Sequence, residues 1–110
     1  MSHKVIDLIS DVKGEDIVLM DLRDVTPIAD YFVICSGNSS RQLKAIVDKV
    51  TEEIKKESRI SPQRVEGNAE GGWMLVDYSG LVIHAFSPEQ RDYYQLEELW
   101  SEGKTIVRIQ

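Results

Sequence analysis

The chain has 110 residues, of which 42% are apolar and 29% are charged, which suits one globular domain and leaves little room for a second. No apolar run approaches the roughly 20 residues of a membrane-spanning helix, and the first residues lack the apolar stretch of a secretion signal, so we expect a cytoplasmic protein that contacts no membrane. The single cysteine, Cys35, excludes an internal disulfide and a cysteine-based metal cluster, and its apolar neighbours predict a buried thiol.

The net charge of −6 is unevenly distributed along the chain. Residues 1–65 hold 11 acidic and 10 basic side chains, whereas residues 66–102 hold eight acidic side chains and a single basic one, Arg91. Because neutralisation of phosphates supplies most of the non-specific affinity for nucleic acids, this acidic stretch predicts little direct nucleic-acid contact. It favours a basic protein partner instead.

The first 35 residues predict one helix and two buried strands. Apolar residues three and four positions apart, followed by Gly14, predict a short amphipathic helix over residues 3–13. Two continuous apolar runs, at residues 17–20 and 31–35, are typical of strands that are covered on both faces. A Thr-Pro turn signal at residues 26–27 separates them.

The turn that follows, from Ser36 to Ser40, is the candidate for enzyme chemistry. Ser39 and Gln42 have the spacing of a capping box, so a second amphipathic helix should run over residues 40–57. Backbone amides of the turn and the helix dipole could hold a phosphate, as in nucleotidyltransferases. The turn lacks the glycine motifs of phosphate-binding loops, and no Asp-x-Asp pair follows it to hold magnesium, so ordinary capping is favoured. A nucleotidyltransferase-like enzyme that uses this turn is the alternative function.

After residue 62 the pattern changes to short strands around glycines. A hairpin is expected at Ser79 and Gly80, with the glycine supplying a positive φ. Together with the first half, the pattern predicts an α/β fold over residues 1–110, with a small mixed β-sheet of about five strands and flanking helices. The remaining expected elements are strands at 64–66, 73–78 and 81–86, a mobile polar loop at 67–72, and short helical segments from Pro88 to Trp100, with 104–109 as a candidate for a further strand.

Six of the eight aromatic residues lie in the second half of the chain. Trp73 follows the glycine-rich loop among acidic residues, so it is either an interface anchor or a core residue. Trp100 is expected in the core with Leu96 and Leu99. His84 is either a hydrogen-bonded strand residue or a partly exposed contact residue, since strand alternation places it on one face with Val82 and Phe86.

Five blocks, in this order, carry a resemblance to a known family: DYFVICSGNSSRQ at 30–42, EG at 66–67, WMLVDY at 73–78, HAF at 84–86 and RDYYQLEELW at 91–100. They resemble the ribosomal silencing factor family, also called the RsfS or Iojap family, over nearly the whole chain. Pro27 in the connection between the first two strands departs from the family pattern, so that turn is expected to differ locally.

The resemblance implies a fold similar to the nucleotidyltransferase core, but a non-enzymatic factor with no cofactor, metal or catalytic residue. It implies binding to ribosomal protein fourteen on the subunit-joining face of the large ribosomal subunit, which keeps the small subunit from docking. Members of the family often form homodimers, so a second copy of the chain is a further candidate partner. Some of the expected contact residues should prove to be core. The candidates are Trp73, Asp77, Tyr78, His84, Phe86, Arg91, Tyr93 and Tyr94.

Overall fold

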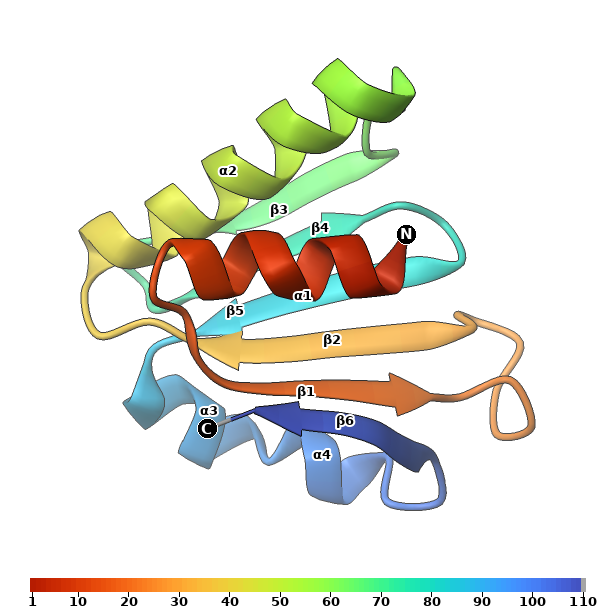
Figure 1. The fold of residues 1–110 in the computed structure, drawn as a ribbon. Helices are drawn as coiled ribbons and strands as arrows, with labels where there is room; N and C mark the ends of the chain where they lie inside the picture. The colour runs from red at the N-terminus through yellow and green to blue at the C-terminus, as the bar shows by residue number, and fades with distance from the viewer. Residues whose placement is uncertain (110) are drawn as a thin grey trace.

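The computed structural model describes residues 1–109, which form a six-stranded mixed sheet with helices on both faces (Figure 1). The strands lie in the order β3-β4-β5-β2-β1-β6, and β2 and β5 run parallel while the other neighbouring pairs are antiparallel. The predicted α/β fold is confirmed, with six strands instead of about five because the last strand pairs with β1. The strands are β1 Glu15–Asp21, β2 Tyr31–Ser36, β3 Arg64–Asn68, β4 Trp73–Asp77, β5 Leu81–Phe86 and β6 Lys104–Ile109; the helices are α1 Ser2–Asp11, α2 Ser40–Ser58, α3 Pro88–Tyr94 and α4 Leu96–Leu99.

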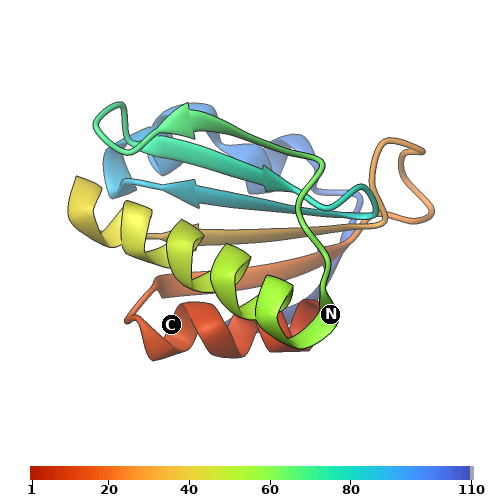
Figure 2. The same cartoon turned by 90° about the horizontal axis from the view of Figure 1, so that it is seen from above.

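Two helices, α1 and α2, cover one face of the sheet, as the view from above shows (Figure 2). Their apolar stripes pack on the strands in one cluster that includes Ile9, Ile46 and Ile83, each at most 1% exposed. Cys35 is fully buried in the same cluster, as predicted, and burial raises the pKa of its thiol to about 12. No helix among residues 1–109 is long and apolar enough to cross a membrane.

The opposite face carries α3 and α4, which cover only part of it (Figure 2). Beneath them, side chains such as Val18, Ile34 and Phe86 form a second, smaller apolar cluster. Every residue of β3 is exposed, and Trp73 and Leu75 on β4 are only half-buried. One corner of this face, over β4 and the neighbouring part of β5, is therefore uncovered.

The start of α2 is built as the sequence predicts. Gln42 donates its backbone N–H to the hydroxyl of Ser39 at 3.1 Å, which satisfies one of the free amides of the first turn. The Gln42 side chain reaches back and accepts from the backbone N–H of Asn38 at 2.6 Å. This reciprocal cap fixes the direction in which the helix leaves β2.

The turns of the second half differ from expectation in two details. In the β4–β5 hairpin the positive φ belongs to Ser79, at 77°, and not to Gly80, because the Asp77 carboxylate accepts from the Ser79 backbone N–H at 2.7 Å and holds that conformation. The predicted loop at 67–72 is shorter, because β3 continues through Gly67 and Asn68. Gly67 takes a φ of 81° within the strand, which a glycine does at little cost.

Candidate functional site

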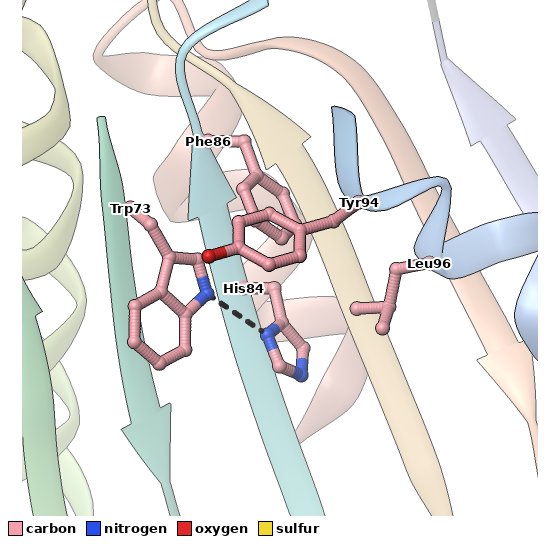
Figure 3. A pocket seen from close by; sticks show the side chains of 5 residues that line it. All are labelled: Trp73, His84, Phe86, Tyr94 and Leu96. Atoms are coloured by element: carbon pink, nitrogen blue, oxygen red, sulfur yellow. Dashed lines mark hydrogen bonds between the residues drawn. The ribbon is translucent and has the colours of Figure 1, made fainter. Parts of the chain in front are cut away.

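An apolar pocket of about 140 Å³ lies at the uncovered corner of the sheet (Figure 3). Trp73 on β4 is paired in register with Phe86 on β5, and His84 lies two positions before Phe86, so the three side chains point to the same face. Tyr94 from the end of α3 and Leu96 from the start of α4 form the other wall. Gln95 between them takes the left-handed conformation at φ 48°, which ends α3 and turns the chain into α4.

His84 is the centre of the aromatic contacts in this pocket. Its Nδ1 accepts a long hydrogen bond, 3.4 Å, from the Trp73 indole Nε1–H, and the two rings stack with centroids 6.4 Å apart (Figure 3). Phe86 lies nearly parallel to the imidazole at 5.9 Å, and Phe32 meets it edge-on at 4.8 Å. Only 7% of His84 is exposed, so of the two interpretations of this residue the hydrogen-bonded strand residue is the one found, and partial exposure is not. Burial lowers its pKa to about 4, so the ring is neutral at pH 7.

Arg91 does not join the pocket; it lies inside the fold with 8% of its surface exposed. Its Nη1 donates to the Asp16 carbonyl at 2.6 Å and to the Ser36 hydroxyl at 2.8 Å, and its Nε donates to Glu97 at 2.8 Å. Arg108 adds ion pairs to Asp16 and Glu97. Burial acts to raise the pKa of Glu97, but the hydrogen bond and the charge of Arg91 act more strongly in the other direction. The pKa of Glu97 is therefore lowered overall. These internal contacts leave Arg91 little surface for a partner.

Two further candidates also lie away from the pocket. Asp77 is 9% exposed and accepts from Arg64 Nε at 3.0 Å, besides holding the hairpin turn. Tyr78 packs against the cluster beneath α1 and α2, on the other face of the sheet. Burial raises the pKa of its hydroxyl, which has no hydrogen-bond partner among residues 1–109. The structure thus brings Trp73, His84, Phe86 and Tyr94 together.

Tyr93, the remaining candidate, is 76% exposed beside the pocket and meets Tyr94 edge-on at 5.1 Å. Leu96 also lines the pocket, but it was not among the candidate contact residues, because its spacing predicted a core position. Leu99 was assigned there too, wrongly: it is 71% exposed, since the four-residue α4 turns it away from the sheet. Trp100 packs edge-on against Phe32 at 5.9 Å and is half-buried, so it is part of the second cluster as predicted.

Three side chains of the turn from Ser36 to Ser40 have structural partners. The Ser36 hydroxyl accepts from Arg91, Ser39 caps α2, and Asn38 donates to Glu15. Within residues 1–109, no group of three or more His, Cys, Asp or Glu side chains is placed to hold a metal ion. The contacts of this turn support the capping role.

The part of the chain that supplies the pocket carries exposed charges of one sign, although the exposed cations Arg64 on β3 and Arg108 on β6 pair with two of its carboxylates, Asp77 and Glu97. Because Arg91 is buried and paired, the exposed charged side chains of residues 66–102 are all carboxylates. A basic surface would be drawn to this part of the molecule, and an acidic surface repelled. The exposed carboxylates are those of Glu66, Glu70, Glu89, Asp92, Glu98 and Glu102.

Comparison with known proteins decides the family. The sequence pattern of a family described as "Ribosomal silencing factor during starvation" matches residues 1–110. The chain belongs to the ribosomal silencing factor family. Within it, the ribosomal silencing factor RsfS of Bacillus subtilis is 39% identical over 93 residues, which are 84% of this chain and 78% of that protein. The resemblance identified in the sequence is confirmed.

Solved structures and a more distant relative agree with this membership. A crystal structure of a Chromobacterium violaceum protein matches with a TM-score of 0.85 at 35% identity, covering 91% of this chain and 82% of that one. A mouse protein named "Mitochondrial assembly of ribosomal large subunit protein 1" is 34% identical over 99 residues, which are 88% of this chain and 43% of that protein. The name of the mouse relative assigns it to the large subunit.

Proposed function

We propose that this chain binds the large ribosomal subunit through ribosomal protein fourteen and, from that position, sterically blocks joining of the small subunit. Family membership supports a role on the ribosome, and the name of the mouse relative supports the large subunit. The observation that carries the proposal is the uncovered corner of the sheet, where an apolar pocket is lined by residues of the stretch 66–102, whose exposed charged side chains are all carboxylates. The site of action is the cytoplasm, where subunits join.

The composition of this corner is that of a protein interface. Trp73, Tyr93 and Tyr94 offer large, partly exposed aromatic side chains, the type most often found as energetic centres of interfaces. The carboxylates around them favour a basic partner, as ribosomal proteins typically are, and disfavour the phosphates of RNA. A protein contact with little nucleic-acid contact is therefore the proposed mode of binding.

The proposal gives the turn from Ser36 to Ser40 no catalytic role. The hydroxyls of Ser39 and Ser36 cap α2 and accept from Arg91, so a phosphate would have to compete with these partners. The enzyme alternative predicts turnover of a nucleoside triphosphate with magnesium, abolished by Ser36→Ala or Ser39→Ala. A second copy of the chain is a further partner that the proposal allows.

Co-sedimentation with purified large subunits tests the proposal directly. The chain should pellet with free large subunits, and adding it before small subunits should lower the yield of joined ribosomes. Isolated ribosomal protein fourteen should compete for the chain. The proposal is wrong if the chain stays in the supernatant, or if it pellets and subunits still join at the normal yield. Nucleotide turnover in place of binding would favour the enzyme.

A further inference from the structure

We propose that the pocket is a socket for one aliphatic side chain of a basic protein segment, and that His84 is the positioning residue that holds the Trp73 indole as its wall. This inference rests on the proposed function and deepens it. The central contact with the partner is assigned to this pocket. Trp73 touches the partner, and His84 holds Trp73 in place.

The size and lining of the cavity indicate its occupant. Its volume of about 140 Å³ is formed by the side chains of Trp73, His84, Phe86, Tyr94 and Leu96. Apolar cavities of roughly 150 Å³ stay dry and accept a single benzene-sized group, which is also the bulk of a leucine or isoleucine side chain. A charged side chain would find no charged partner among these five residues, so its desolvation would not be compensated.

Charge excludes some occupants and favours others. The chain carries a net charge of −6, and the exposed charged side chains of residues 66–102 are carboxylates. A second copy that offered the same acidic surface would be repelled at this position. A segment with an aliphatic side chain flanked by lysine or arginine would bury the aliphatic group and place its cations near the carboxylates of α3.

His84 determines the position of the indole through two contacts. The Nε1–H of Trp73 has one acceptor, Nδ1 of His84, and the imidazole stacks on the indole from the floor of the pocket. His84 is itself fixed between Phe86 and Phe32. Trp73 is half-buried, so without these contacts its indole could rotate into the cavity or away from it. A wall held in place before binding lowers the ordering cost of association.

Benzene is the first probe, because it tests the cavity without the ribosome. Titrated into the isolated full chain, it should shift the NMR resonances of the Trp73 indole and of Leu96, and leave those of exposed Leu99 unchanged. The variant Leu96→Trp, which fills the cavity, should abolish the shift. An unshifted wild-type spectrum at saturating benzene would overturn the socket.

Binding of the large subunit then tests the occupant. Leu96→Trp should weaken co-sedimentation by roughly tenfold or more, as expected for loss of a central contact. Leu99→Trp is the matched control, because Leu99 is on the same short helix, is 71% exposed, and should bind within about twofold of wild type. If wild type binds and Leu96→Trp binds equally well, the socket is wrong while the proposed function stands. If wild type does not bind, the proposed function fails. A homodimer that Leu96→Trp dissociates would instead assign the socket to a second copy.

The role of His84 needs a readout other than affinity. In His84→Gln the side-chain carbonyl can still accept from the indole, whereas His84→Leu removes the acceptor. Solvent exchange of the Trp73 indole proton, assigned in a Trp100→Phe background, should be slow in wild type, intermediate in His84→Gln and fast in His84→Leu. Binding should follow the same order. Equal exchange rates in all three, or full binding by a folded His84→Leu, would overturn the positioning role.

Discussion

Arg91 donates from Nη1 to the hydroxyl of Ser36 at 2.8 Å, although 55 residues separate them in the chain. Ser36 ends β2 and Arg91 lies in α3, so this bond fixes the helical segment to the end of the sheet. The same guanidinium holds Glu97, beside Leu96 in α4. Arg91 therefore supports both elements that supply the outer wall of the pocket.

Replacing Arg91 should destabilise the fold severely. In Arg91→Ala the Asp16 carbonyl and the Ser36 hydroxyl lose a buried charged donor and Glu97 loses one of its two arginines, and loss of a hydrogen bond to a charged group costs about 1.5–3 kcal/mol. Arg108→Ala removes a half-exposed arginine from the same network and should cost below about 1 kcal/mol. Urea unfolding of both variants measures the difference. Equal losses would contradict the buried role of Arg91.

His84 should make stability depend on pH. Its pKa is about 4 in the folded chain and 6.5 ordinarily, so between these values the unfolded state binds more protons and stability falls as the pH falls. From pH 7 to pH 5 this loss is about 2 kcal/mol. The loss of stability levels off below pH 4, where the histidine is protonated in both states. Urea unfolding should show a smaller loss over that range in His84→Gln, in which all other titrating groups are retained. The same loss in both proteins would contradict the lowered pKa.

Gly67 should tolerate no side chain. Its φ is 81°, and a Cβ at that position would collide with the backbone carbonyl oxygen of Trp73. Gly67→Ala should therefore lower the free energy of unfolding by more than about 1 kcal/mol. Gly71→Ala, in the adjoining turn, lacks the positive φ and should cost less. Thermal unfolding compares the two, and a Gly67→Ala midpoint at or above that of Gly71→Ala would refute the expectation.

Local signals predicted most of the elements. The helix expected at 40–57 is Ser40–Ser58, because both of its signals, the Ser39–Gln42 cap and the apolar periodicity, come from residues close together in the chain. The role of Arg91 could not be predicted, because its partners, Asp16 and Ser36, are distant in sequence and meet only after the sheet has formed. The sequence predicted the aromatic candidates but could not show that Tyr78 faces α1 and α2 while Trp73 faces the pocket, since that depends on which face each layer covers.

Reversing the charge of exposed carboxylates should weaken subunit binding. Asp77→Lys is a poor probe of binding, because Asp77 is 9% exposed and its loss would disturb Arg64 and the hairpin. Glu89→Lys and Asp92→Lys, on exposed positions of α3, should each weaken subunit binding severalfold, more so at low salt.

Lysine neutralisation on α2 is the control for that experiment. Lys44 and Lys49 are on α2, across the sheet from the pocket. The variants Lys44→Ala and Lys49→Ala should therefore bind as wild type does. The opposite ranking, with the lysine variants unable to bind and the α3 variants unaffected, would assign the contact to ribosomal RNA.

Truncating the two tryptophans should separate binding from folding. Trp73 is half-buried and lines the pocket, so Trp73→Ala should weaken binding by roughly thirtyfold and lower the thermal midpoint moderately. Trp100 packs against Phe32 beneath α4, so Trp100→Ala should lower the midpoint more and affinity less. Calorimetry and co-sedimentation measure both. Unchanged binding by Trp73→Ala would remove that residue from the interface.

The position of β6 beside β1 has a consequence for the order of folding. While the chain is being synthesised, β1 can pair with β2 early, but its other edge stays free until residues 104–109 have emerged. A free, straight strand edge invites pairing with other chains. In its pairing with β2, β1 carries an extra residue between Glu15 and Val18, whereas the extra residue in the β1–β6 pairing belongs to β6. A bulge bends and twists its strand, which makes the edge a poorer template for wrong partners, so the bulge of β1 protects that edge while the nascent chain is most prone to aggregate.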